Sequence, residues 1–157
     1  MRLTSAANKP RIKMKTAIVL SFMLILGFAH QSVANQLSDF TTDGCSRSPD
    51  GIWIEDAEAF LDCCVKHDVA YWRGGTADER LNADHQLKVC IENKGYPNVA
   101  ETYYYAVRMG GHPVFHTSYR WGYGWQIDRG YSPLSNSDWM QVIHKIIKAK
   151  NEGIKID

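Results

Sequence analysis

The sequence lacks several features that would point to a repeat protein or a membrane-spanning protein. Its 157 residues contain no internal repeat and no low-complexity linker, which favours one folded domain with a real core. The longest apolar stretch covers only Ala17 to Ala29, too short for a comfortable membrane span. No Cys-x-x-Cys pair is present, and this absence weakens the case for a zinc site.

The sequence also lacks an excess of positive charge. It contains 18 lysines and arginines against 17 aspartates and glutamates. Five of these cations and none of the acids lie in the first 34 residues, so loss of this segment leaves thirteen cations, seventeen acids and a net charge of minus four. This balance argues against nucleic acid as a partner, and binding to anionic lipid would depend on local patches.

Residues 1–34 have the pattern of a secretory signal peptide. Several cations precede the apolar run, and the small-residue sequence Ser32-Val33-Ala34 follows it as a cleavage site. No cysteine directly follows that site to take a lipid anchor. We therefore expect a single mature domain, residues 35–157, exported to a periplasm or secreted; the alternative is an uncleaved N-terminal anchor.

The spacing of residues predicts a helical hairpin in the first half of this domain. The first helix should end at Gly74-Gly75, because glycine takes the left-handed conformation without a Cβ penalty. The sequence Thr76 to Glu79 is a capping box that opens a second helix at once, so the two helices must run antiparallel. One face of the first helix carries five side chains at helical spacing: Phe60, Cys63, Cys64, His67 and Tyr71.

Counting outward from the turn places two pairs of residues nearly level across the hairpin. These pairs are His67 with Asp84, and Cys63 with Cys90. A carboxylate beside an imidazole fixes its tautomer and stabilises the imidazolium, as in hydrolases. Tyr71 has a hydroxyl that could reach Asp84, so we expect these three side chains to form a catalytic group. The alternative is a buried, purely structural histidine.

The order of residues around His67 resembles that of a known family. The segment Cys63 to Tyr71 reads Cys-Cys-x-x-His-Asp-x-x-Tyr, and Asp84 and Cys90 follow it. This pattern resembles the secreted phospholipase A2 family, with Asp43 to Gly51 at the place of that family's calcium loop. The resemblance covers the motif core, residues 43–90, and implies a short microbial-type member.

The resemblance implies roles for individual residues. His67 would draw a proton from water, Asp84 would hold the imidazole, and Asp68 would bind calcium. Backbone carbonyls of the loop would supply further calcium ligands, near Gly44, Ser46 and Ser48.

The sequence departs from the family's pattern in three places. Ala70 stands where the family usually has a cysteine, and the long excursion between the two helices is reduced to a tight turn. The loop also lacks the family's glycine-rich run. The loop is therefore the weaker part of the resemblance, although acidic residues near it suit a hard cation.

The four cysteines of an exported chain are expected to form disulfides. A bond between adjacent Cys63 and Cys64 would be badly strained, which leaves two connectivities. The levels across the hairpin and the family resemblance both favour Cys63–Cys90 with Cys45–Cys64. A zinc cluster made of Cys63, Cys64, Cys90 and His67 is the alternative.

The aromatic C-terminal extension, residues 98–150, begins with a third predicted helix from a cap at Asn98 to Gly110-Gly111. Between His112 and Leu134, aromatic residues alternate with glycine and arginine. This row is interpreted either as a lipid- or substrate-facing surface or as an irregular hairpin that packs on the core. The side chains assigned to such a surface are Tyr119, Arg120, Trp121 and Trp125.

A last helix is predicted after a cap at Ser137. It carries lysines towards its C-terminal end, which suits the helix dipole. A basic amphipathic helix can lie on a membrane, but in a small domain its apolar stripe is expected to pack on the core. That stripe is made of Trp139, Val142, Ile143, Ile146 and Ile147.

Together these patterns predict a mostly α domain built on a disulfide-linked antiparallel helix hairpin. The predicted function is calcium-dependent hydrolysis of the fatty-acyl ester of phospholipids, at a membrane or lipid surface, by a water that the His-Asp pair activates. The alternative is a non-catalytic module on the same scaffold that binds a membrane or a protein. The sequence does not indicate an oligomeric state.

Overall fold

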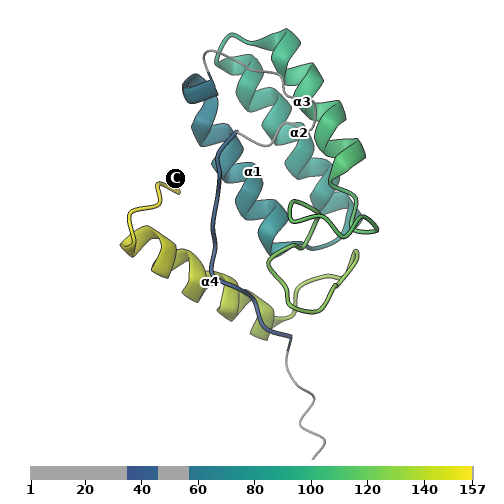
Figure 1. Ribbon diagram of the computed structural model, residues 1–157, viewed down its shortest axis with the longest axis vertical. Helices are drawn as coiled ribbons and strands as arrows, with labels where there is room; N and C mark the ends of the chain where they lie inside the picture. Colours follow the sequence, from purple (N-terminus) through teal and green to yellow (C-terminus); the bar gives the residue numbers. More distant parts are fainter. Residues whose placement is uncertain (1–34, 46–56, 157) are drawn as a thin grey trace, which may run out of the picture. The chain divides into compact units, whose positions relative to one another are not determined.

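A computed structural model describes residues 35–45 and 57–156, which belong to one compact unit, Ala34–Asp157. The predicted leader and the predicted loop ligands Ser46 and Ser48 lie outside the described residues. Across residues 35–45 and 57–156 the chain is mostly helical, and its only β pairing is an isolated antiparallel bridge between Leu37 and Trp125. The helices are η1 (Ala57–Phe60), α1 (Leu61–Arg73), α2 (Ala77–Asn93), α3 (Pro97–Gly110) and α4 (Asn136–Asn151) (Figure 1).

Helices α1 and α2 lie side by side, and α3 packs along α2 (Figure 1). The α1–α2 connection is short because Gly74 and Gly75 both take positive φ angles, 68° and 141°. Thr76 then caps α2 as predicted: its hydroxyl accepts from the Glu79 amide at 3.2 Å, and the Glu79 carboxylate accepts from the Thr76 amide at 2.8 Å. Of the described helices, none combines the length and apolar character needed to cross a bilayer.

Two disulfides join the elements around α1. The bond Cys63–Cys90 links α1 to α2, and Cys45–Cys64 links residues 35–45 to α1, so these are the pairs expected from the sequence. Asp62 places a carboxylate near the sulfurs of Cys63 and Cys90, but bonded sulfurs are not thiolate ligands. The disulfides therefore contradict the zinc alternative.

Apolar side chains pack on two sides of α1. On one side, Phe60, Cys63 and Cys64 contact Leu87 and Ile91 of α2 and residues of α3. The other side of α1 packs against the N-terminal segment, the aromatic row and α4. The buried members of this second cluster are Leu37, Phe40, Val65, Trp72, Trp125, Val142 and Ala149.

The aromatic row binds the C-terminal end of α1. A helix end leaves several carbonyls without helical partners, and residues 121–125 supply donors to them. Trp121 and Trp125 are 0% and 2% exposed, which corrects their assignment to a lipid-facing surface. Four hydrogen bonds make this contact: Trp121 Nε1 to Gly75 O (2.8 Å), Gly122 N to Tyr71 O (2.6 Å), Gly124 N to Trp72 O (3.0 Å) and Trp125 Nε1 to Arg73 O (2.7 Å).

Helices α3 and α4 begin earlier than predicted. Pro97 is the first residue of α3, where its missing N–H costs nothing, so Asn98 lies inside the helix. Helix α4 is capped by Ser135 rather than Ser137, because Ser135 forms a capping box with Asp138.

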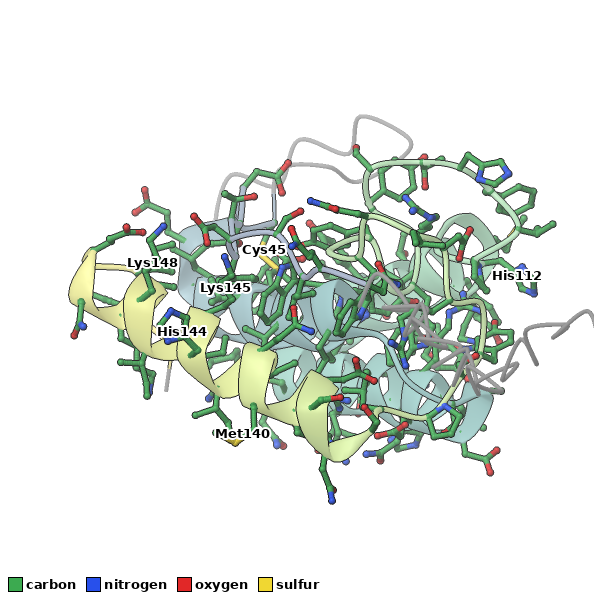
Figure 2. The ribbon with its side chains drawn as sticks, turned by 90° about the horizontal axis from the view of Figure 1, so that it is seen from below. Cys45, His112, Met140, His144, Lys145 and Lys148 are labelled. Atoms are coloured by element: carbon green, nitrogen blue, oxygen red, sulfur yellow. A yellow bond between two sulfur atoms is a disulfide. The ribbon has the colours of Figure 1, made fainter. Side chains whose placement is uncertain are left out.

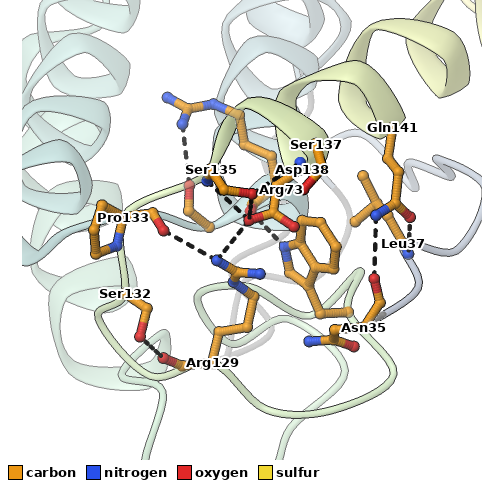
Figure 3. A network of polar contacts seen from close by, with 12 residues as sticks. Asn35, Leu37, Arg73, Arg129, Ser132, Pro133, Ser135, Ser137, Asp138 and Gln141 are labelled. Carbon is orange, nitrogen blue, oxygen red and sulfur yellow. Dashed lines mark hydrogen bonds and ion pairs between the residues drawn. The ribbon is translucent and has the colours of Figure 1, made fainter. Parts of the chain in front are cut away.

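The N-terminal end of α4 is held by polar contacts (Figure 3). Arg129 pairs with Asp138 at 3.0 Å. The Gln141 amide donates to Asn35 O at 3.1 Å and accepts from the Leu37 amide at 3.0 Å (Figure 3). The start of α4 is therefore fixed both to the loop before it and to the first described residues.

The predicted apolar stripe of α4 is split between two faces. Val142 is buried and Ile146 is partly buried in the cluster around Trp72. Ile143, Ile147 and Trp139 are exposed, so the expectation that the whole stripe packs on the core is wrong. The stripe spans more of the helix circumference than the neighbouring elements cover, and Ala149 completes the inner face instead.

Candidate active site

A cavity of about 90 Å³ lies beside α1 and carries the predicted chemistry on its wall. His67 and Asp68 of α1 line it, together with Tyr71 one turn later. The start of the predicted calcium loop contributes Asp43 and Gly44. Apolar residues of α2 and α3 complete the wall, mainly Leu87, Tyr103, Ala106 and Val107.

His67 and Asp84 form a buried hydrogen-bonded pair. His67 Nε2 lies 2.8 Å from Asp84 Oδ1, across the α1–α2 hairpin. An ionised carboxylate only accepts hydrogen bonds, so this contact assigns the ring proton to Nε2 and leaves Nδ1 with a lone pair. The Tyr71 ring lies against the imidazole, with centroids 4.2 Å apart. The histidine is thus fixed in position with one nitrogen available as a base.

Asp84 is fully buried and remains ionised because several groups bind it. Arg108 Nη1 donates to Asp84 Oδ2 at 2.6 Å, and Arg80 Nε lies 3.9 Å from the same oxygen. Burial alone would raise the pKa of Asp84, but the hydrogen bond and charge of His67 and the hydrogen bond from Arg108 outweigh it and lower the pKa. The carboxylate can therefore stabilise a positive charge on the imidazole.

Arg80 is buried behind the site and supports Tyr71. Its Nε donates to the Tyr71 hydroxyl at 3.0 Å, and its Nη1 donates to the Tyr131 hydroxyl at 2.7 Å. Its Nη2 donates to the carbonyls of Val107 and Arg108 at 2.9 and 2.7 Å. Burial together with the charge of Asp84 raises the pKa of Tyr71, which stays a neutral phenol. Arg80 therefore joins α1, α2 and α3 around the carboxylate.

Asp68 offers oxygen ligands at the edge of the cavity. The Thr42 hydroxyl donates to Asp68 Oδ2 at 2.5 Å and also accepts from the Gly44 amide at 3.0 Å. Burial raises the pKa of Asp68 to about 7; the Thr42 bond opposes this rise and the charge of Asp43 adds to it. No described ion pair involves Asp68, so a buried carboxylate near a second carboxylate fits a hard cation such as calcium.

The structure brings most of the predicted site residues together. His67 contacts both Asp84 and Tyr71, and Asp68 and Gly44 line the same cavity as His67. The Tyr71 hydroxyl donates to Val107 O at 3.2 Å and not to Asp84. Trp121 and Trp125 are structural instead. Tyr119 lies at the cavity wall and is 41% exposed, whereas Arg120 is paired with Asp128 at 3.6 Å.

Three site residues are absent from the sequence-based prediction. Arg80 stands four positions before Asp84 on α2, so helical spacing alone could have found it. Arg108 and Thr42 reach the site from distant segments, and no local pattern marks them. Among the described residues, these side chains hold the two carboxylates of the site in place.

Comparison of the chain with models of protein families, with curated proteins and with solved structures finds no match. A functional assignment therefore depends on the arrangement of these side chains.

Proposed function

We propose that this protein hydrolyses the fatty-acyl ester of phospholipids with the help of calcium. The observation that carries the proposal is the buried His67–Asp84 pair, whose histidine lines a partly apolar cavity with the Asp68 carboxylate on the same wall. The sequence pattern of secreted phospholipase A2 supports it. The apolar side chains of α2 and α3 that line the cavity suit an acyl chain.

In this proposal His67 acts as a general base toward water. Its Nδ1 accepts a proton from a water, while Nε2–H stays bound to Asp84. The buried carboxylate stabilises the imidazolium that forms, and Arg108 holds that carboxylate in place. The same imidazolium can then return the proton to the leaving alkoxide.

Asp68 and the carbonyl of Gly44 would hold the calcium ion, with the predicted ligands Ser46 and Ser48 beyond the described residues. Bound calcium supplies a Lewis acid that polarises the ester carbonyl. Thr42 keeps the Asp68 carboxylate directed at the start of the loop, because its hydroxyl bonds both.

We also propose that the protein is exported. The predicted leader motivates this, and the two disulfides are typical of proteins in oxidising compartments.

The direct test measures fatty-acid release from phospholipid micelles, with calcium and with a chelator. His67→Ala should abolish calcium-dependent release, because it removes the imidazole nitrogen that takes the proton from water in this proposal. His85→Ala is the matched control, since His85 is an exposed histidine on α2. Undiminished release by His67→Ala would refute the proposal.

A non-catalytic binding module is the second candidate. The observation that favours it is the exposed apolar face of α4, which lies outside the cavity. This candidate predicts binding to lipid or protein without any fatty-acid release, and such binding would survive His67→Ala.

A further inference from the structure

Helix α4 carries an exposed apolar surface, here called the outer face of α4. Its four members recur at spacings of one, three and four residues, so they share one side of the helix. On that side, near its centre, lie no glutamate and no aspartate. The exposed fractions are 38% for Trp139, 67% for Met140, 50% for Ile143 and 55% for Ile147.

The outer face is separate from the side of α4 that packs on the domain. Val142, Ile146 and Ala149 face the cluster around Trp72. In Figure 2, Met140 lies at one edge of the helix, away from Lys145 and Lys148. Those two lysines are bound to Asp39 of the N-terminal segment. Trp139 contacts Arg73 of α1 through its ring, whereas Met140, Ile143 and Ile147 are additional to the surface that packs α4 on the domain.

The charged residues near the outer face favour contact of this face with a lipid surface over permanent exposure to water. Both acids of α4 and its C-cap are engaged elsewhere: Asp138 with Arg129 at 3.0 Å, and Glu152 with Lys148 at 3.6 Å. Lys150 is exposed and follows Trp139 by three helical turns, so it borders the apolar residues. The face thus presents apolar groups with two cations at its border: Lys150, and Arg73, whose guanidinium lies 5.1 Å from the centre of the Trp139 ring and also pairs with Glu79 at 3.4 Å.

The size of the face argues against a second copy of the chain as its partner. The exposed fractions correspond to about two fully exposed large side chains, or roughly 400 Å². A stable protein interface needs about 800 Å² from each partner. Shallow insertion into a bilayer interface requires only one such face, and tryptophan is favoured at that depth.

We propose that the outer face of α4 docks the protein onto the surface of a phospholipid bilayer, with Ile143 and Ile147 inserted among the acyl chains and Trp139 at the headgroup level. This deepens the proposed function by naming the surface that meets the lipid, and it depends on that function for its biological purpose. Docking itself requires no hydrolysis, so it can be measured separately.

The test measures partition of the mature domain, residues 35–157, onto phosphatidylcholine vesicles by sedimentation, in a chelator that prevents turnover. The parent should bind, and the double variant Ile143→Ser with Ile147→Ser should lower the partition coefficient about tenfold or more. Leu81→Ser is the control, since Leu81 is 46% exposed on α2. It should change the coefficient less than about twofold. Because apolar burial drives binding, added salt should have little effect.

Tryptophan fluorescence provides a second readout. Of the four tryptophans in the described residues, three are buried and Trp139 is exposed. Vesicles should shift its emission to the blue, and Trp139→Phe should remove that shift. Circular dichroism of each variant should match the parent, because the substituted side chains are exposed.

Three outcomes would overturn the docking proposal. The first is failure of the parent to sediment with vesicles, and the second is equal binding by the double variant and the parent. The third is a parent dimer in analytical ultracentrifugation that the double variant dissociates, which would assign the face to a second copy. The two proposals can fail separately. If the parent releases fatty acid from micelles but the double variant binds vesicles as well as the parent does, only the docking proposal is refuted. If vesicle binding depends on the outer face of α4 but no fatty acid is released, only the proposed hydrolysis is refuted.

Discussion

Replacing Arg108 by leucine tests whether the site depends on a charged partner for its buried carboxylate. Arg108 Nη1 lies 2.6 Å from Asp84 Oδ2, and Asp84 is fully buried. Loss of a hydrogen bond to a buried charge costs about 1.5–3 kcal/mol, and breaking a fully buried pair costs about 3–5 kcal/mol. Arg108 is 30% exposed and His67 still binds the carboxylate, so the lower range applies. We expect the free energy of unfolding to fall by about 2 kcal/mol.

The pH dependence of this effect follows from the direction of the Asp84 shift. Its folded-state pKa lies below the usual value of 3.8, so the folded protein favours the ionised carboxyl. Stability from this group is fully present above about pH 4 and is lost as the pH falls through the folded-state pKa. The difference between parent and Arg108→Leu should therefore be largest near neutral pH and should shrink in acid.

The assay is urea unfolding of the oxidised protein at neutral pH and at acid pH. Lys88→Met is the matched control, because Lys88 pairs with Glu101 across α2 and α3 and both partners keep contact with solvent, at 25% and 46% exposed, whereas Asp84 is fully buried. Exposed pairs contribute about 0–1 kcal/mol, so this variant should unfold almost as the parent does. Equal destabilisation by the two substitutions, or a loss at Arg108 that does not change with pH, would refute the reasoning.

Three further predictions address the cavity and the end of α1. Asp68→Asn should weaken calcium binding in a titration. It should also stabilise the calcium-free protein above pH 7 by on the order of 1 kcal/mol. The folded-state pKa of Asp68 is raised to about 7, so the parent loses stability as the pH rises through that value, and asparagine does not ionise. Gly111→Ala should destabilise the fold by about 1–3 kcal/mol in thermal unfolding, since a Cβ there would lie 2.3 Å from the Tyr71 ring. Gly110→Ala is the control and should not destabilise the fold in this way, because its Cβ would meet only ordinary contacts. Trp121→Phe should cost about 2 kcal/mol in urea unfolding, because it leaves the Gly75 carbonyl without its buried donor.

Local sequence signals were sufficient for the hairpin that carries the site. The glycine pair, the capping box at Thr76 and the level positions of His67 and Asp84 all depend on short-range geometry, and the structure agrees with each of them. A capping residue was misplaced at α4, where Ser135 and Ser137 are both suitable hydroxyls. Only the position of Asp138 three residues after Ser135 distinguishes them.

The contacts made by the last third of the chain could not be read from the sequence. Alternating aromatic residues are typical both of a lipid-facing surface and of a packed segment. The packed arrangement is the observed one because the carbonyls at the end of α1 need hydrogen-bond donors, and the aromatic row supplies them. This need becomes visible only in the three-dimensional structure. Arg108 likewise acts on a carboxylate 24 positions away on another helix. The division of α4 into two faces depends on which neighbours are present.

The first described residues have a bearing on the order in which the protein can fold. Gln36 accepts from the Gln126 amide, Ser38 donates to the Gly124 carbonyl, and Asn35 bonds Ile127 over a separation of 92 residues. When only the α1–α2 hairpin has emerged from the ribosome, residues 124–127 have not yet been synthesised. The first segment must therefore wait until synthesis passes Ile127, and contacts of such long sequence separation slow folding. The α1–α2 hairpin can form early, but the end of α1 that supports Tyr71 is completed late in synthesis.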